Sequence, residues 1–168
     1  LMWSKNDSGA NGFNGPRSGM TWIEALDYVR QKNNEGYLGY SDWRLPNAKE
    51  MQSILDYSRA PDATGTAAID PVFNITVIFN EAGISDYPWF WTGTTHVNSS
   101  GIASHAVYIC FGRSMGYMNR TWMDVHGAGS QRCDRKDGNF FQFTFVPNGY
   151  FLAFSPQGDA SRLYNYVR

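Results

Sequence analysis

A serine, an aspartate and a histidine occur in the chain in the order that many hydrolases use. Ser114 lies at the centre of a Gly-x-Ser-x-Gly pattern at 112–116, and Asp124 and His126 follow it. In a hydrolase this pattern forms a sharp turn between a strand and a helix, which exposes the serine as a nucleophile. The residues after Gly116 are not typical of a helix start. Asp124 and His126 are only two positions apart, so on a strand their side chains would be parallel, a poor arrangement for orienting the imidazole. We expect a tight turn here and no enzymatic activity.

Acidic and amide side chains near the C-terminal end could bind a cation. Ca²⁺ takes 6–8 oxygen ligands from carboxylates, amides and carbonyls. The segment 134–139 combines acids, glycine and asparagine in an order typical of turns, but without the EF-hand spacing. Ordinary turns built on Asp and Asn are the alternative. The expected calcium ligands are Asp124, Asp134, Asp137, Asn139 and Asp159.

The two cysteines, Cys110 and Cys133, could form a disulfide in an oxidising compartment or remain free thiols in a reducing one. Cys110 lies in an apolar stretch and Cys133 in a locally basic one. A redox or metal role would need both thiols in one electropositive cleft. We expect a disulfide between them, and free thiols remain the alternative.

The composition indicates a folded, turn-rich domain. The chain has 168 residues, of which 16% are aromatic and only 17% charged, and its net charge is −1. Nucleic-acid binding and a polybasic membrane anchor both need a concentration of positive charge, so we expect neither. No apolar run approaches the roughly 20 residues of a membrane span, so we expect no insertion into the bilayer. The length and the lack of linkers predict a single domain over 1–168.

Helical periodicity occurs only in the first third of the chain. A capping box, Thr21 with Glu24, precedes a helix predicted at about Trp22–Asn33. A second capping box begins at Asn47, and this helix is predicted to end near Ser58. Short apolar runs then alternate with turn residues, so the fold class is α+β. The predicted strands are Phe73–Phe79, Trp89–Thr94, Ala106–Phe111, Phe141–Val146, Tyr150–Phe154 and Arg162–Val167.

The stretch 139–154 is unusually aromatic. Its Asn148-Gly149 dipeptide predicts a hairpin. One face of this hairpin can enter the core, but the aromatic rings on the two faces cannot all do so. We expect a partly exposed aromatic ridge that contacts a ligand; a hairpin packed on both faces and an oligomer interface are the alternatives. The expected ligand-binding residues are Phe140, Tyr150, Phe154, Tyr117 and Arg120.

Two segments, Met20–Tyr28 and Gly39–Asn47, resemble a bacterial family, the C-terminal domain of Legionella collagen-like protein. The most specific part is Asp-Trp-Arg-Leu-Pro-Asn at 42–47. The resemblance implies a C-type-lectin-like fold, in which two helices pack on a small, twisted, mainly antiparallel sheet with long loops. The Arg-Leu-Pro element also resembles formylglycine-generating enzymes. Further matching segments are Ala68–Phe73, Phe90–Thr95 and Tyr164–Arg168.

The tryptophans inside these motifs, Trp22, Trp43 and Trp91, are expected in the core. We expect Asp42 and Arg44 to form an internal salt bridge or to anchor the backbone.

The resemblance also implies a function. Members of the family are mostly secreted or attached to the cell surface, and some are adhesins that bind glycans. We therefore expect an extracellular or bacterial cell-surface module that recognises a glycan or a partner protein without catalysis, with Ca²⁺ as the candidate cofactor. A homo-oligomer is compatible with this function. The alternatives are an oxidase-type enzyme related to the formylglycine-generating enzymes, and a structural domain that trimerises or caps a stalk.

Overall fold

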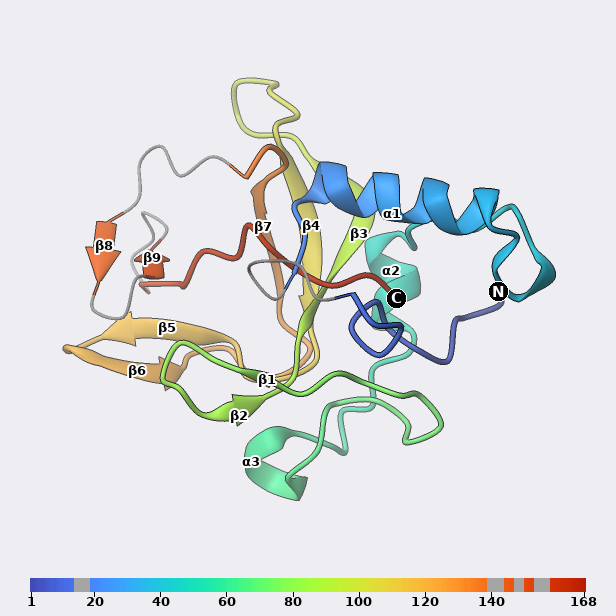
Figure 1. Cartoon of the computed structure of the whole chain (residues 1–168). Helices are drawn as coiled ribbons and strands as arrows, with labels where there is room; N and C mark the ends of the chain where they lie inside the picture. The colour runs from blue at the N-terminus through green and yellow to red at the C-terminus, as the bar shows by residue number, and fades with distance from the viewer. Residues whose placement is uncertain (14–18, 139–143, 147–149, 153–157) are drawn as a thin grey trace.

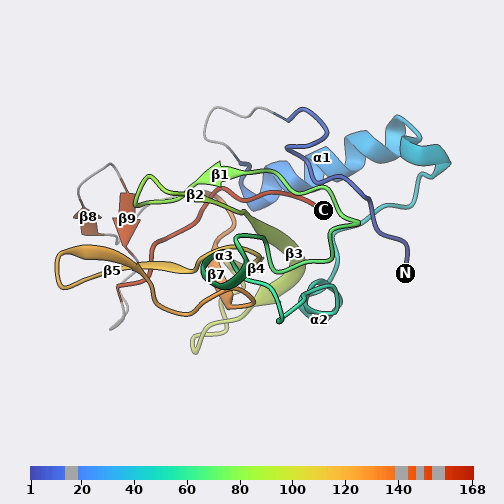
Figure 2. The same cartoon turned by 90° about the horizontal axis from the view of Figure 1, so that it is seen from below.

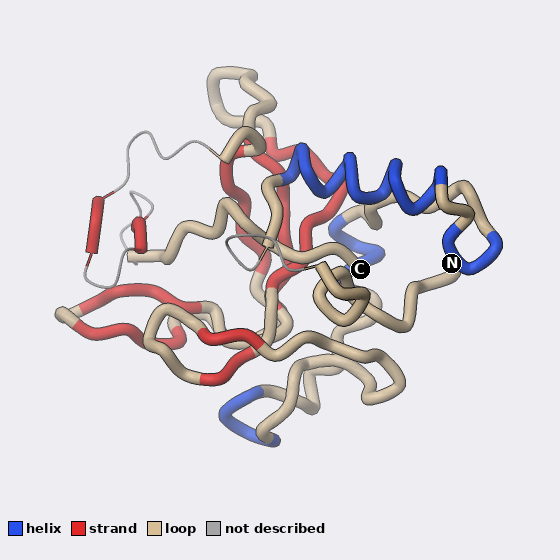
Figure 3. The backbone as a smooth tube through the Cα atoms, in the orientation of Figure 1, coloured by secondary structure: helices blue, strands red, loops and turns tan. Residues whose placement is uncertain are grey.

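A three-stranded antiparallel sheet lies at the centre of the molecule, in the order β3-β4-β7 (Figure 1). Its strands are β3 (Trp89–His96), β4 (His105–Cys110) and β7 (Gln131–Arg135). Much of the remaining chain is loop, as the tube in Figure 3 shows. The structure is a computed structural model that describes residues 1–13, 19–138, 144–146, 150–152 and 158–168, and only the backbone of 144–146 and 150–152.

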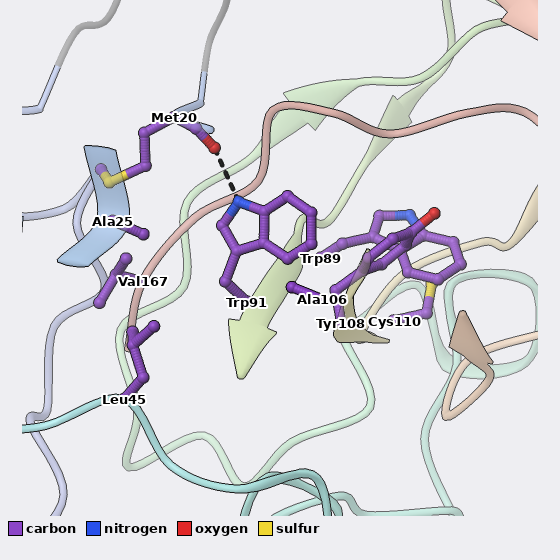
Figure 4. Close-up of a cluster of buried hydrophobic side chains, with 9 residues drawn as sticks. All are labelled: Met20, Ala25, Leu45, Trp89, Trp91, Ala106, Tyr108, Cys110 and Val167. Carbon is purple, nitrogen blue, oxygen red and sulfur yellow. Dashed lines mark hydrogen bonds between the residues drawn. The ribbon is translucent and has the colours of Figure 1, made fainter. Parts of the chain in front are cut away.

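The central strand β4 divides the core into two clusters because its side chains alternate between the two faces of the sheet. Tyr108 and Cys110 point into one cluster, whereas Val107 and Ile109 point into the other. In the first cluster the buried Trp91 indole donates a hydrogen bond to the carbonyl oxygen of Met20 at 2.7 Å (Figure 4). This bond satisfies the only polar atom of a large side chain that is otherwise in apolar surroundings.

Helix α1 (Trp22–Asn34) packs on the first cluster and begins at the predicted capping box. The Thr21 side chain accepts from the Glu24 backbone N–H, and the Glu24 carboxylate accepts from the Thr21 backbone N–H at 2.7 Å. Seen from below, α1 lies on one side of β3 and α2 on the other (Figure 2). The first helix is therefore confirmed in both position and capping.

Helix α2 (Ala48–Gln52) packs on the second cluster and begins at the expected Asn47 cap, but it is much shorter than predicted. It ends six residues before Ser58, because the chain leaves the helix to pair with a later segment. Leu55 forms a β-bridge with Ile69, and the Asp56 N–H donates to the Ala68 carbonyl at 3.0 Å. A 3₁₀ turn, η1 (Tyr37–Gly39), and a short helix, α3 (Pro61–Thr64), complete the helical elements of the described residues.

Three two-stranded antiparallel sheets surround the centre. The strands β8 and β9 pair antiparallel, as expected for the predicted hairpin, whose Asn148-Gly149 turn lies outside the described residues. The pair β5–β6 and the strand β7 were not predicted, since their sequences lack regular apolar alternation. Only the end of the strand expected at 73–79 forms, as β1. The strand bounds are β1 (Ile78–Phe79), β2 (Ser85–Asp86), β5 (Met115–Met118), β6 (Thr121–Asp124), β8 (Thr144–Val146) and β9 (Tyr150–Leu152).

The C-terminal segment forms single bridges in place of the predicted strand Arg162–Val167. Asn165 pairs with Met20, and Tyr166 pairs in parallel with Phe90 at the edge of the central sheet. These bridges tie the segment to α1 and to β3 at once, so no single partner strand runs alongside it. The architecture is α+β, with few helices and several small antiparallel sheets. No helix in the described ranges is long and apolar enough to cross a membrane.

Candidate functional site

The expected aromatic ridge lies largely outside the described residues. Phe140 and Phe154 are not described, and of Tyr150 only the backbone is, at the start of β9. Tyr117 and Arg120 lie on the β5–β6 hairpin. The Tyr117 ring is 5.0 Å from the Trp122 ring, and Arg120 is exposed at the tip with φ 61°. Ligand binding by these five residues therefore stays a prediction.

Among the expected calcium ligands, Asp134 is buried in a network of its own. Its Oδ2 accepts hydrogen bonds from the Tyr108 hydroxyl at 2.5 Å and from the Arg162 backbone N–H at 2.7 Å. Burial raises the pKa of Asp134 to about 6, which these hydrogen bonds offset only in part. This carboxylate ties β7 to the C-terminal segment, so it already has a structural role.

The other expected calcium ligands also have separate partners. Asp159 accepts from Arg132 at 2.6 Å, and Asp137 pairs with Arg135 at 2.6 Å. Asn139 lies outside the described residues. Within the described part of the chain, no three His, Cys, Asp or Glu side chains gather where they could hold a metal. Calcium binding stays a prediction, without a preformed cluster in this part of the chain.

The Gly-x-Ser-x-Gly pattern forms a turn and not the start of a helix, as its sequence predicts, and it leads into strand β5, which was not predicted. The Asp124 carboxylate accepts from the backbone N–H groups of Ser114 at 2.9 Å and Gly127 at 2.8 Å. His126 Nε2 lies 3.1 Å from Asp159 Oδ1. Asp124 therefore stabilises the turn through its backbone N–H groups. The imidazole of His126 lies next to Asp159 and not next to Asp124.

The two cysteines are free thiols, which corrects the expected disulfide. Cys110 points into the first cluster, and its thiol donates to the Gly112 carbonyl at 3.0 Å. Cys133 is opposite Val107 in the sheet and packs against the second cluster. The thiols therefore lie on opposite faces of the sheet, because β4 residues that differ by an odd number face opposite ways. Cys133 Sγ is 3.2 Å from His96 Nδ1.

A depression that sequence reasoning missed lies between the N-terminal segment, the end of α1 and the Asp-Trp-Arg-Leu-Pro motif. It has two adjoining parts that share lining residues, which we name the outer part, of ≈ 220 Å³, and the inner recess, of ≈ 40 Å³. Both parts are lined by Ser4, Trp43, Arg44 and Arg168. The inner recess is also lined by Asn6, Asn11, Tyr28, Lys32 and Tyr37, and the outer part by Trp3, Asp42 and Pro46.

Trp43 is the aromatic centre of this depression and is only half-buried, which corrects its expected place in the core. The Asn33 side chain brackets its backbone, accepting from the Trp43 N–H at 2.7 Å and donating to its carbonyl at 2.9 Å. Its indole N–H donates to the Tyr37 carbonyl at 2.9 Å. The Trp43 ring also packs on two tyrosines, with centroids 5.7 Å from Tyr37 and 6.2 Å from Tyr40. The indole is thus fixed in orientation. Trp22 is half-buried too, whereas Trp91 is fully buried as expected.

The inner recess places an ammonium group between two phenol rings. Lys32 Nζ lies 5.4 Å from the Tyr28 centroid and 5.6 Å from that of Tyr37. Its hydrogen bond to Glu35 raises the pKa of Lys32, so this group stays charged. The Tyr37 hydroxyl also lies 3.1 Å from the Asn11 amide nitrogen. The recess therefore combines aromatic faces with directional polar groups, the composition typical of small-molecule sites.

The sequence does contain a signal for this depression. Trp43 follows Gly39-Tyr-Ser-Asp, a run that contains three turn residues, and connecting segments almost always run over the protein surface. Arg44, the next residue, forms an exposed bidentate pair with Glu50 at 2.7 and 2.8 Å, which corrects the expected internal salt bridge of Asp42 and Arg44. That pair is on the surface, whereas Leu45 and Pro46 of the same motif are buried.

The comparisons with known proteins identify one family. No curated protein and no solved structure matches the chain. The profile of the Lcl C-terminal domain matches residues 1–127, which include α1, the Asp-Trp-Arg-Leu-Pro motif and the central strands β3 and β4. A match over this share of the sequence confirms the resemblance drawn from the motifs. The chain belongs to the Lcl C-terminal domain family.

Proposed function

We propose that this domain is a non-catalytic recognition module that binds a glycan in the depression around Trp43. The observation that carries the proposal is the half-buried, rigidly held indole of Trp43 at the junction of two hollows. Because its N–H is already bonded to Tyr37, the indole can offer a ligand only its apolar face. A sugar ring has an apolar face of C–H groups and a rim of hydroxyls. Aromatic side chains that lose little entropy on binding suit such a ligand.

The polar groups around the indole support the same conclusion. Ser4, Asn11 and the Tyr37 hydroxyl lie within one hydrogen-bonded group, with Ser4 Oγ 3.2 Å from Tyr37 Oη. Hydroxyl and amide groups can both donate and accept, which matches the hydroxyls of a sugar. The exposed carboxylate of Asp42 adds an acceptor on the outer side.

The family supports the setting and the fold that we propose. An extracellular or cell-surface location is what the resemblance implies, and so is a C-type-lectin-like fold. The central antiparallel sheet, with α1 and α2 on its two faces and long loops, is compatible with that fold. The oxidase-type alternative needs two neighbouring cysteines, and here Cys110 and Cys133 lie on opposite faces of the sheet.

A glycan array with the 168-residue chain tests this function. We expect binding to a subset of glycans, a loss of at least about tenfold in affinity in Trp43→Ala, and partial retention in Trp43→Phe, which keeps an aromatic face. Tyr57→Ala is the matched control, because Tyr57 is 72% exposed and lines neither hollow. Parallel arrays with Ca²⁺ and with EDTA test the expected cofactor. An array without any bound glycan, or unchanged binding by a folded Trp43→Ala protein, would contradict the proposal.

A further inference from the structure

The outer hollow has room for only one small unit of a ligand. Its volume of ≈ 220 Å³ is below the roughly 300–1,000 Å³ of pockets for drug-sized molecules. The adjoining recess adds only ≈ 40 Å³, and its lining includes Lys32, Tyr28 and Tyr37. Several consecutive sugar residues would not fit inside, whereas a single terminal ring would. The volume therefore favours the end of a glycan chain over its interior.

The cationic side chains that line the depression are each paired with an acid. The three pairs are Lys32–Glu35 at 2.8 Å, Arg44–Glu50 at 2.7 Å and Arg168–Asp7 at 3.7 Å. An anionic ligand would have to compete with these carboxylates for the same donors.

The remaining charge of the site also opposes an anion. Asp42 lines the outer hollow, is exposed and has no cation within salt-bridge distance among the described residues. The Arg168 side chain has no exposed surface, and its guanidinium donates to the carbonyls of Lys5 and Asn74. Arg168 therefore holds the N-terminal segment in place and is not presented to a ligand. The charged side chains that line the depression therefore nearly balance one another.

From this size and charge balance we infer that the depression recognises one uncharged terminal sugar residue. Its apolar face packs on Trp43, and its hydroxyls take hydrogen bonds from the group around Ser4 and Asn11 and from the carboxylate of Asp42. This inference rests on the proposed function and specifies the ligand class of the same site. It excludes uronic acids, sialic acid and sulfated residues as the preferred terminal unit.

Titration with neutral hexoses and N-acetylhexosamines, in parallel with a uronic acid, tests the charge of the ligand. Tryptophan fluorescence or saturation-transfer NMR gives the affinities. We expect at least one neutral sugar to bind in about the millimolar range, as a single small unit should, and more tightly than the uronic acid by about threefold or more. Raising the salt from about 50 to 500 mM should change this affinity by less than about twofold, because screening acts on charged partners.

Asp42→Asn gives a second measurement at the same site. A neutral sugar should lose affinity or be unaffected, because the amide keeps an acceptor and removes no attraction. A charged ligand should instead gain affinity, because a repulsive carboxylate is gone. Binding that favours the uronic acid, strengthens in Asp42→Asn or falls about tenfold with salt would overturn the inference while leaving glycan recognition intact.

Binding to the end of a glycan chain is tested with glycans that have the same interior sugar residues but differ in their terminal residue. We expect binding to follow the terminal residue, and removal of that residue by an exoglycosidase to abolish it. Binding that persists after its removal would overturn the inference. If neither sugars nor arrayed glycans bind a folded protein, the proposed function fails together with it.

Discussion

The carboxylate of Glu50 links the Arg44 side chain to the start of helix α2. It accepts both guanidinium bonds of Arg44, at 2.7 and 2.8 Å, and also accepts from the backbone N–H of Asn47 at 2.7 Å. One acid thus completes the capping box of α2 and fixes the arginine beside Trp43. Together these bonds lower the pKa of Glu50 to about 2.

Glu50→Gln should therefore lower the melting temperature at neutral pH. Because the folded-state pKa is depressed, the stabilisation is present above the unfolded-state value of 4.5 and is lost as the pH falls toward about 2. Wild-type and variant proteins should thus converge as the pH falls from about 5 to 2. The matched control is Glu24→Gln, which removes the same negative charge from the capping box of α1, at a site with no arginine partner in the described chain. A gap between wild type and Glu50→Gln that persists at low pH would contradict this role.

The contribution of Asp134 to stability should have the opposite pH dependence to that of Glu50. Its folded-state pKa is raised to about 6 by burial, so its contribution is fully present below the unfolded value of 3.8 and is lost as the pH rises through about 6. Both hydrogen bonds of this side chain converge on Oδ2, a position that an asparagine carbonyl can occupy. Asp134→Asn should keep them and remove the titration. Relative to this variant, the wild type should lose on the order of 2–3 kcal/mol between pH 4 and 7 in urea unfolding. If the free energies of unfolding of the wild type and of Asp134→Asn change in parallel between pH 4 and 7, Asp134 is ionised throughout this range.

Substitutions at Trp91 and at Trp43 should separate effects on the stability of the fold from effects on ligand binding. Trp91 is fully buried, so Trp91→Ala should cost about 3–5 kcal/mol in urea unfolding. Trp43 is half-buried, and Trp43→Ala should cost roughly half as much while removing glycan binding. Trp91→Phe should retain binding in the folded fraction, although it removes the indole donor to the Met20 carbonyl, which still accepts from the Asn165 backbone N–H at 3.0 Å. Equal losses of stability at the two positions would mean that the Asp-Trp-Arg-Leu-Pro motif is core after all.

The number of free thiols per chain should be measurable in solution with a thiol reagent. Cys110 is fully buried and its pKa is raised well above the usual value by burial, whereas Cys133 is half-buried with a smaller rise. A thiol reagent should modify at most one cysteine per folded chain, more rapidly at alkaline pH, and two in denaturant without reductant. Cys133→Ser should abolish the reaction of the folded protein. Absence of any thiol in the denatured, unreduced protein would establish the disulfide.

The tip of the β5–β6 hairpin should tolerate glycine. Arg120 has φ 61°, a left-handed conformation that costs a side-chain-bearing residue roughly 1 kcal/mol, and Asn119 precedes it at φ 51°. Arg120→Gly should stabilise the domain by about 0.4–1 kcal/mol, and Asn119→Gly by less, because asparagine tolerates this region. The same variant tests the expected ligand contact of Arg120: weaker glycan binding by a more stable protein would establish it, and unchanged binding would refute it.

Local signals predicted the elements that depend on local chemistry. The capping boxes at Thr21 and Asn47 satisfy backbone N–H groups with neighbouring side chains, so their sequence pattern was sufficient. The early end of α2 depends on pairing of Leu55 with Ile69, which no local pattern contains. The single bridges of Asn165 and Tyr166 likewise depend on partners far away in the sequence.

The candidate site was predicted less well, because exposure depends on what packs above a side chain. The family motif was recognised from its residues, but Trp43 was placed in the core since tryptophan usually is. Its actual position depends on Asn33, which holds its backbone, and on Tyr37, which takes its indole N–H. The separation of Cys110 from Cys133 follows from strand register, and the register of β4 with β7 could not be derived without knowing that β7 exists.

The bridges of the C-terminal segment have a consequence for the order of folding. The Ser8 hydroxyl accepts from the Val167 backbone N–H across 159 positions of sequence, and Ser8 N–H donates back to the Val167 carbonyl at 2.8 Å. During synthesis, the partners of Ser8, Met20 and Phe90 leave the ribosome only after nearly all of the domain. The nascent chain must therefore wait with an unfinished core, and such long-range closure predicts slow folding and an exposed, aggregation-prone interval until residues 165–167 have left the ribosome.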